Sequence, residues 1–372
     1  MKIQRVLLPL FVLIGVIEGN AQQDVQVSQY IISPMLINPA FSSVADYWET
    51  NFVYRNQWVG IKDAPVTTYI STQSTIGKPH FSSTHKRDFH GWHGVGALIM
   101  KDQIGPLSTN RLKLNYSYNK GLTSGKKYGH SHEDGLRLAF GAVLDYSSVR
   151  IDKNLLAQSQ NSSGDNVSNG DALNDVTFAR ISPNAEPVFD IDLGLMLYYN
   201  NTFFLGVSSS QVLQSTEVYG GYGGLRRHYY LTGMIKSPLN EQWFLISSVL
   251  VKSVNAAPVS LDVGFQLDWT DRIFLGTGYR YQDAVTLMIG YRHQWGEKIK
   301  HFRRDKHSYI MQFYYSYDIT TSKLGQRSLE YGSTGSHEIT LGFLLPPKYK
   351  ERNAEDTWRR GNTNNLHKKN RK

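Results

Sequence analysis

The side chains best suited to chemistry in this 372-residue chain are Asp and Arg residues at alternate positions within apolar runs. Asp190 and Asp192, two residues apart, resemble the paired carboxylates of acid–base catalysis. Four other residues supply both signs of charge and suit a network of ion pairs instead: Arg55, Asp262, Arg280 and Asp318. There is no phosphate-binding loop, no His-Glu-x-x-His motif, and no Gly-x-Ser-x-Gly in a strand–turn–helix context. We therefore expect a non-enzymatic protein without a cofactor.

Histidines concentrate in two neighbouring segments and raise the question of a metal site. They are His80, His85, His90, His93, His130 and His132. Imidazole is a common zinc ligand, but this spacing matches no compact ligand set, and Asp88 is the only acid near the first group. The absence of cysteine excludes thiolate metal sites, disulfides and a cysteine nucleophile. We predict that no metal is bound.

The charged residues lie in segments of strict alternation. Between residues 259 and 269 every odd position is apolar, and every even position is polar or Gly. A period of two over this length is typical of a tilted membrane strand. The pattern recurs and predicts fourteen strands, at 48–57, 67–75, 94–101, 108–119, 136–146, 188–199, 202–210, 228–237, 243–253, 259–269, 273–281, 284–295, 307–318 and 337–345. An even number fits a closed antiparallel transmembrane β-barrel with both ends of the chain on one side.

Other fold classes explain the pattern less well. A soluble β-sandwich also alternates, but a chain of this size is then expected to show a domain break, and no linker interrupts the strands. A mean hydropathy of -0.38 argues against a polytopic helical membrane protein. In a membrane barrel the charged set must face inward, because a Lys or Arg on the lipid face near midplane costs ~2–4 kcal/mol.

The two ends of the chain carry separate signals. Residues 1–21 combine Lys2 and Arg5 with a twelve-residue apolar run, and predict a signal peptide cleaved before Gln22. Residues 346–372 hold nine basic and three acidic residues, so most of the net charge of +9 lies in this tail. The basic pI therefore reports a tail and not a nucleic-acid-binding domain. We expect export to the outer membrane, with the tail in the periplasm.

Loop lengths predict the orientation of the barrel. Short connections follow the sixth, eighth and tenth strands, whereas the longest connection, 147–187, follows the fifth and is expected outside the cell. Aromatic side chains beside flexible glycine suit protein recognition, and we predict partner contacts at four extracellular residues: Trp58, Val59, Tyr219 and Tyr222. An aromatic girdle at the membrane interface is the alternative. On the periplasmic side, contact with anionic lipid or with an acidic partner is expected at Arg303, Arg304, Arg359 and Arg360.

A series of motifs in the same order along the chain resembles the PorP/SprF family of Bacteroidetes outer-membrane proteins, which is associated with type IX secretion and gliding. The motifs are Gln29-Tyr30, Asn38-Pro39-Ala40-Phe41, the run from Tyr54 to Gly60, Arg227-His228-Tyr229-Tyr230, the run from Tyr279 to Ala284, and Gly335-Ser336-His337-Glu338-Ile339. The resemblance covers essentially all of residues 22–345, and the basic tail extends beyond it.

The resemblance implies a non-enzymatic component of type IX secretion that assists export or surface retention of a cargo protein, such as an adhesin, through its C-terminal domain. Its expected partners are membrane lipids, that cargo domain and periplasmic secretion components. Asn38-Pro39-Ala40 is also similar to the N-terminal segment of fatty-acid-transporter-like barrels, which implies a plug within 22–47 and a barrel at 48–345. A diffusion channel or hydrophobic-ligand transporter, and a structural anchor for periplasmic rings, remain as alternatives.

Overall fold

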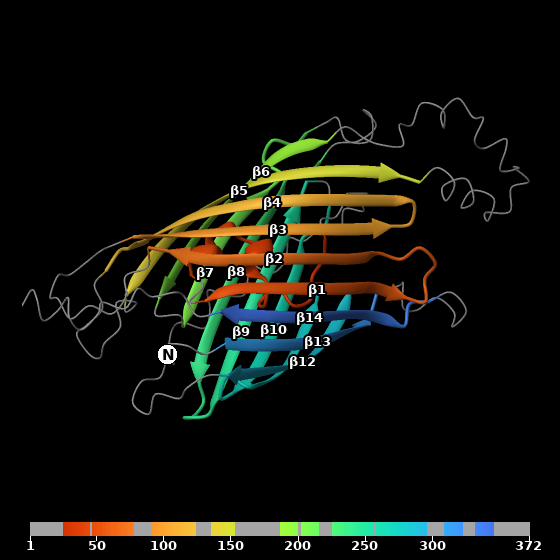
Figure 1. Ribbon diagram of the computed structural model, residues 1–372. Helices are drawn as coiled ribbons and strands as arrows, with labels where there is room; N and C mark the ends of the chain where they lie inside the picture. Colours follow the sequence, from red (N-terminus) through yellow and green to blue (C-terminus); the bar gives the residue numbers. More distant parts are fainter. Residues whose placement is uncertain are drawn as a thin grey trace, which may run out of the picture.

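The computed structural model is a closed antiparallel barrel in which each strand pairs with its neighbours in sequence (Figure 1). The structure describes residues 25–44, 47–77, 91–123, 135–152, 187–199, 202–215, 225–255, 257–295, 309–322 and 332–345. Fourteen strands lie in these ranges, and pairing of the last with the first closes the sheet. The predicted fourteen-stranded antiparallel barrel is confirmed.

The strands follow the alternating segments closely. They are β1 (Trp48–Val59), β2 (Val66–Ile76), β3 (Trp92–Ile104), β4 (Leu107–Gly121), β5 (Leu136–Ile151), β6 (Val188–Tyr199), β7 (Phe203–Ser210), β8 (His228–Pro238), β9 (Trp243–Val254), β10 (Ser260–Trp269), β11 (Ile273–Arg280), β12 (Ala284–Trp295), β13 (Tyr309–Thr320) and β14 (Gly335–Leu345). The clearest difference is in β3 to β5, which are longer than the apolar alternation predicts. Polar outward residues interrupt the side-chain pattern there, but backbone pairing continues.

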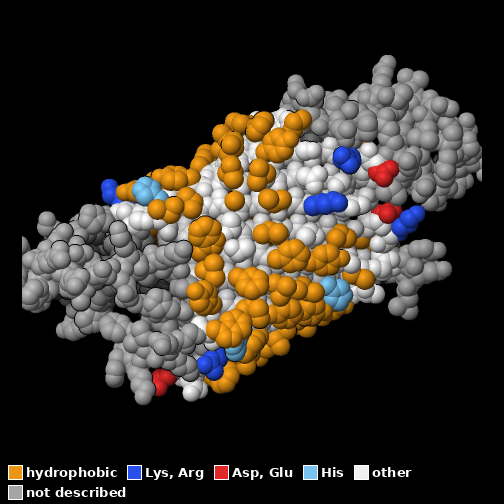
Figure 2. All heavy atoms as spheres, in the orientation of Figure 1, with side chains coloured by type: hydrophobic (Ala, Val, Ile, Leu, Met, Phe, Trp, Pro, Cys, Tyr) orange, Lys and Arg blue, Asp and Glu red, His pale blue; other side chains and the backbone are white. Residues whose placement is uncertain are grey.

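We call the end of the barrel where β1 begins and β14 finishes the terminal end, and the opposite end the loop end. The outer face is apolar over most of the height between them, because successive side chains of a strand point to opposite faces. In β10, for example, Phe265 is 50% exposed and its neighbour Gln266 is 2% exposed. Figure 2 shows the resulting band of hydrophobic side chains across the strands. This exterior suits a hydrocarbon surrounding.

Aromatic side chains lie near both ends of the strands. At the terminal end Trp243 and Trp269 face each other across β9 and β10, with ring centroids 6.3 Å apart. At the loop end Tyr279 on β11 is exposed and Tyr317 on β13 is half-buried. Such girdles mark the two membrane interfaces of a barrel. No helix among the described residues is long or apolar enough to span a bilayer.

Residues 25–44, which we call the lumenal segment, lie inside the barrel. Two short 3-10 turns shape it, at Pro34–Leu36 and Pro39–Ser43. Each begins with proline, whose fixed φ suits a first turn and whose missing N–H does not allow a strand ladder. Asn38 caps the second turn, since its side-chain oxygen accepts a hydrogen bond of 3.0 Å from the amide of Ala40. These local signals explain an irregular segment amid so many strands.

The lumenal segment packs on inward-facing side chains from several strands. Val27 and Met35 join a buried cluster with Tyr69 and Leu98, and Ala40 joins another with Met196. These apolar contacts lie on the inner wall of the barrel, among its polar side chains. They hold the segment against the barrel by the same burial of apolar surface that stabilises a soluble core. The sealing role predicted for residues 22–47 remains a prediction.

Glycines let the segment lie directly on the barrel wall. A Cβ added at Gly141 of β5 would come within 2.3 Å of the backbone nitrogen of Ala40, and one at Gly194 of β6 within 2.2 Å of the Asn38 side chain. Real Cβ atoms do not approach so closely, so these positions accept only glycine while the segment is in place. Because glycine has no side chain, the backbone of the lumenal segment can approach the strands closely at these two positions.

Candidate functional site in the barrel lumen

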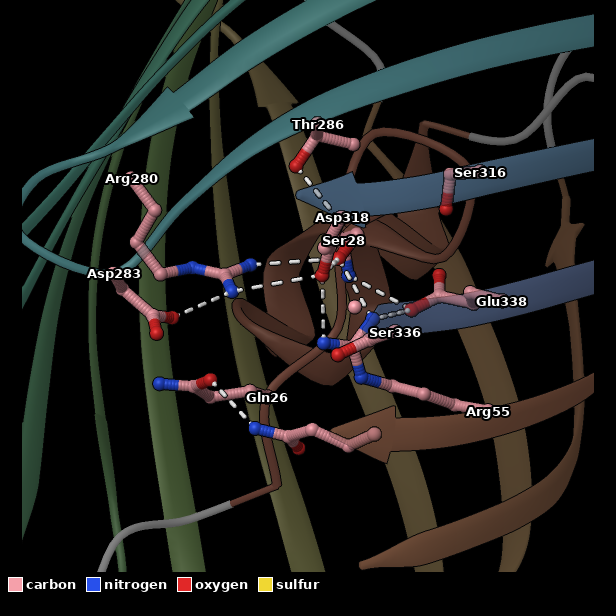
Figure 3. Close-up of polar contacts among 12 residues, drawn as sticks. Gln26, Ser28, Arg55, Arg280, Asp283, Thr286, Ser316, Asp318, Ser336 and Glu338 are labelled. Atoms are coloured by element: carbon pink, nitrogen blue, oxygen red, sulfur yellow. Dashed lines mark hydrogen bonds and ion pairs between the residues drawn. The ribbon is translucent and has the colours of Figure 1, made fainter. Parts of the chain in front are cut away.

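Arg55 of β1 lies at the centre of a buried ion network (Figure 3). Its Nη2 is 2.8 Å from Oδ2 of Asp318 on β13, and its Nη1 is 2.9 Å from Oε2 of Glu338 on β14. The register places Arg55 directly opposite Glu338. All three side chains are at most 2% exposed. Alternation brings them together because each occupies an inward position of its strand.

Arg280 of β11 extends the network on its other side. Its Nη1 lies 3.0 Å from Oδ2 of Asp283 and 3.8 Å from Oδ2 of Asp318, and its Nε lies 3.4 Å from Oδ1 of Asp262. Lys252 of β9 pairs with the same Asp262 at 3.1 Å. The structure thus brings together the four residues named from the sequence, and adds Lys252, Asp283 and Glu338 to them.

The lumenal segment is bound to this network. The backbone amides of Ser28 and Gln29 donate to the two carboxylate oxygens of Glu338, at 2.8 and 2.9 Å. The Ser28 hydroxyl donates to Asp318 at 2.6 Å and accepts from Nη1 of Arg55 at 2.7 Å. Gln29 adds a side-chain bond of 3.1 Å to Ser316. We call this set the seam latch: Ser28, Gln29, Arg55, Asp318 and Glu338.

Sequence reasoning did not predict that Ser28 and Gln29 contact the network. They precede any periodic segment, so alternation cannot assign them a face. Glu338 is likewise absent from the four residues of the predicted network. Its signal was available, because it sits at an inward position of β14 as Arg55 does in β1.

The network consists of ion pairs between carboxylates and basic side chains. Its four carboxylates, Asp262, Asp283, Asp318 and Glu338, each contact a basic residue. Breaking a buried pair by removing one partner typically costs ~3–5 kcal/mol, since the other charge is left uncompensated. The arrangement therefore favours a fixed interior.

A second ion cluster lies on the inner faces of β4, β5 and β6. Lys113 pairs with Asp192 at 2.7 Å and with Asp145 at 3.4 Å. Asp192 also accepts from the amide of Gln211 at 2.9 Å, and Asp190 accepts from the amide of Leu213 at 2.9 Å. Asp190 and Asp192, which the spacing alone would allow as a catalytic pair, thus hold the chain that follows β7.

Two small cavities lie beside the ion clusters of the lumen. One of about 40 Å³ adjoins the network and is lined by residues that include Tyr30, Asp262 and Arg280. Another of about 20 Å³ lies beside Val27 and Lys113. Volumes of this order hold a few waters, whereas a small-molecule pocket takes ~300–1,000 Å³. The Tyr30 hydroxyl lies 2.8 Å from that of Ser248, and burial raises the pKa of Tyr30 to about 12, so the hydroxyl stays protonated.

The predicted extracellular contacts lie differently from the expectation. Trp58 and Val59 are the last residues of β1 and are half-buried, so the prediction that this strand ends at residue 57 and leaves both of them in the following connection is wrong. A bulge between Asn56 and Val59 lets the ladder continue, with Trp58 at φ 52 and its amide donating to Ser336 at 3.0 Å. Bulges insert a residue without ending the strand. Alternation, which assumes strict pairing, could not place this irregularity.

Other predicted features lie outside the described residues. They are Tyr219, Tyr222, Arg303, Arg304, Arg359, Arg360, the signal peptide at 1–21, the tail at 346–372 and most of the histidines. His93 is described, and it faces outward with its ring nitrogen 2.7 Å from the Tyr116 hydroxyl. Within the part of the chain that the structure describes, no group of three or more His, Asp or Glu is arranged to hold a metal.

A closed strand barrel with an apolar band outside and ion pairs inside defines an integral protein of the bacterial outer membrane. The family model described as type IX secretion system membrane protein PorP/SprF matches residues 19–343. The chain belongs to this family, whose members are membrane components of type IX secretion.

Solved structures similar to the chain include proteins named as a channel and as an outer membrane protein. The CymD monoaromatic hydrocarbon channel is 11% identical, with a TM-score of 0.44, and 86% of this chain and 93% of that chain are covered. A Pseudomonas aeruginosa FadL homologue is 10% identical, with a TM-score of 0.44 and coverage of 83% and 92%. The Acinetobacter baumannii outer membrane protein Omp33 is 6% identical, with a TM-score of 0.36 and coverage of 81% and 99%. No curated protein matches the chain.

Proposed function

We propose that this barrel assists export or surface retention of a cargo protein by type IX secretion, and that it engages the cargo's C-terminal domain while its own lumen stays closed. Membership of the PorP/SprF family supports the secretion role. One observation supports a closed lumen: the backbone amides of Ser28 and Gln29 both donate hydrogen bonds to the carboxylate of Glu338. A segment held by charge-assisted hydrogen bonds at a buried ion network resists displacement.

In this proposal the barrel is a platform at the cell surface and not a conduit. The cargo domain contacts three aromatic residues and one valine of the loop end, namely Trp58, Tyr219, Tyr222 and Val59. Aromatic anchors contribute most of the binding energy at many interfaces. Periplasmic secretion components contact the basic residues of the opposite side, namely Arg303, Arg304, Arg359 and Arg360, through charge complementarity.

Two measurements on one preparation test the proposal. The full chain is purified from its native host in mild detergent, its bound proteins are identified, and it is then reconstituted in planar bilayers. A platform carries a type IX cargo protein and conducts no more than bilayers without protein. Steady open-channel current without cargo would support the diffusion channel instead. Periplasmic proteins bound without cargo would support the structural anchor.

The proposed contacts are tested by substitution in the host. Trp58→Ala, Tyr219→Ala and Tyr222→Ala are combined, and cargo at the cell surface is measured by antibody on intact cells. We expect a loss of at least tenfold with unchanged amounts of folded barrel. Tyr309→Ala is the matched control, because Tyr309 is an exposed aromatic residue at the terminal end. Equal surface cargo in the triple variant and the control would refute these contacts.

The periplasmic contacts need a separate variant. Arg303→Gln, Arg304→Gln, Arg359→Gln and Arg360→Gln are combined, and periplasmic proteins retained by the purified barrel are compared with wild type. We expect these proteins to be lost while the cargo is retained. Retention of the same periplasmic proteins would remove this part of the proposal and would leave the cargo role intact.

A further inference from the structure

One part of the outer face departs from the apolar pattern. At the loop end of β3, β4 and β5 the outward residues are polar or basic, and we call them the basic rim patch: Lys101, Gln103, Ser108, Asn110, Ser148 and Arg150. The register arranges them in two rows. In the first row Asn110 of β4 pairs with Lys101 of β3 on one side and with Ser148 of β5 on the other. In the second row Ser108 of β4 pairs with Gln103 and with Arg150 in the same way.

The patch begins directly beside the hydrophobic band. One step toward the middle of the same strands, the outward residues are Ile99, Leu112 and Tyr146, which pair in register. Ile99 is 65% exposed, as a lipid-facing side chain is. Two residues of a strand span ~7 Å, so the surface changes from apolar to basic over that distance. Such a change is expected where hydrocarbon gives way to lipid headgroups.

The charge of the patch is positive. Lys101 and Arg150 are exposed, and neither forms an ion pair with another described residue. The acids of the same strands face the interior, where Asp102 accepts from the Thr67 hydroxyl at 2.6 Å and Asp145 pairs with Lys113. Asp152 is exposed, but it follows the last residue of β5 and lies beyond the patch. Figure 2 shows basic side chains on the polar surface beyond the hydrophobic band, with acidic side chains farther out beside them.

The spacing of the two cations suits phosphate groups. Lys101 and Arg150 lie two strands apart and one row apart, which places their Cα atoms ~12 Å from each other. Both side chains are long and flexible enough to converge on one phosphate or to hold two neighbouring phosphates. Between them Asn110, Ser108 and Ser148 offer amide and hydroxyl groups, which can exchange hydrogen bonds with sugar hydroxyls.

Two strands elsewhere in the wall present aromatic residues near the loop end. Tyr279 on β11 and Tyr317 on β13 are aromatic residues of the usual interface girdle. The replacement of that girdle by cations, amides and hydroxyls on three adjacent strands indicates a site for one kind of headgroup. A phospholipid headgroup would use the cations, whereas a phosphorylated sugar would use the polar side chains as well.

We propose that the basic rim patch binds the phosphorylated sugar headgroup of a glycolipid in the outer leaflet. Lys101 and Arg150 hold its phosphates, and the polar residues between them contact its sugar. The proposal requires that the loop end face outward, as the loop lengths predict, and it is independent of the proposed cargo role.

The test measures lipid retention by the full-length barrel. The protein is reconstituted in zwitterionic nanodiscs, and binding of a bis-phosphorylated lipid A is compared with that of its dephosphorylated form. We expect Lys101→Gln combined with Arg150→Gln to weaken binding of the phosphorylated lipid about 10- to 30-fold, because each basic residue near an anionic surface contributes ~1 kcal/mol. Lys120→Gln is the matched control, since Lys120 is exposed on the outward face of β4 at the terminal end.

Each outcome decides the question. Weakened binding in the double variant, unchanged binding in the Lys120 variant and weak binding of the dephosphorylated lipid support the proposal. Equal binding by wild type and double variant would overturn it, as would equal affinity for the dephosphorylated form. Equal competition by phosphatidylglycerol would overturn the choice of a sugar headgroup. Folding of every variant is checked by heat-dependent mobility on SDS gels, and Asn110→Ala gives a second variant that keeps both charges.

Discussion

Arg55 and Glu338 lie directly opposite each other on β1 and β14, the two strands whose pairing closes the barrel, and an ion pair of 2.9 Å joins them. The same carboxylate accepts hydrogen bonds from two consecutive amides of the lumenal segment, those of Ser28 and Gln29. One side chain therefore contributes both to closure of the sheet and to retention of the segment inside it.

Glu338→Gln should destabilise the barrel strongly. The substitution keeps the size of the side chain but leaves Arg55 with one carboxylate fewer, and it weakens the two amide contacts. We expect the free energy of unfolding in lipid vesicles to fall by ~3–5 kcal/mol, measured by urea titration with Trp fluorescence. Asp63→Asn, on an exposed loop residue, should change it by less than ~0.5 kcal/mol. Similar values for the two variants would contradict the role of the seam latch.

Asp318→Asn should cost more stability than Asp262→Asn. Asp318 contacts both Arg55 and Arg280, and it accepts from Ser28 and from the Thr286 hydroxyl at 2.8 Å. The described partners of Asp262 are all strand residues, namely Lys252, Arg280 and Ser260. The same urea titration measures both variants. An equal or reversed order would show that the contact with the lumenal segment contributes little.

Gly141→Ala should displace the lumenal segment. The new Cβ would fall within 2.3 Å of the backbone of Ala40, so the segment must move away from β5. We expect ion conductance in planar bilayers to appear or to rise well above that of wild type. Gly278→Ala is the matched control, because its Cβ would meet no atom closer than 3.4 Å. Closed bilayers for both variants would mean that the segment does not seal the lumen.

Ser42→Cys with Ser117→Cys should form a disulfide between the lumenal segment and β4. The two hydroxyl oxygens are 2.7 Å apart, and the chain has no cysteine of its own. We expect complete loss of free thiols on mild oxidation, counted by mass spectrometry after alkylation. Ser42→Cys with Ser74→Cys is the control, since Ser74 lies on the outer face of β2 and the barrel wall separates the pair. A bond in the control pair alone would contradict the placement of the segment.

The locked variant also tests whether function needs the segment to move. If the proposed platform works with a closed lumen, surface cargo should be the same in oxidised and reduced cells that carry the Ser42–Ser117 pair. Loss of cargo on oxidation alone would indicate that the segment leaves its position during secretion.

Alternation predicted the barrel well because it is a direct consequence of strand geometry. The inward position of Asp262 and the outward position of Phe265 follow from parity once the strand is recognised, and the structure has both. Strand ends were predicted less well. The predicted strand 136–146 stops short because Ser148 and Arg150 interrupt the apolar pattern. The backbone ladder does not depend on these side chains, and β5 continues to Ile151.

The lumenal contacts depended on information that periodicity does not carry. Ser28 and Gln29 belong to an irregular segment, so nothing in their own sequence assigns them to Glu338. Glycines offered an overlooked signal. Gly141 and Gly194 occupy inward positions of adjacent strands, where a barrel filled only by side chains would favour larger residues. Such glycines indicate that another length of backbone lies against the wall.

The bond from Ser28 to Glu338 joins residues 310 positions apart, and its acceptor is on the last strand to be made. A nascent or truncated chain that lacks this strand loses the Glu338 contacts of Ser28 and Gln29, and Arg55 keeps only one of its two carboxylate partners, Asp318. The contacts of Ser28 and Gln29 with Glu338 therefore form only after β14 has been synthesised and paired. Defective products should be recognisable to periplasmic proteases by a loose, accessible leading end.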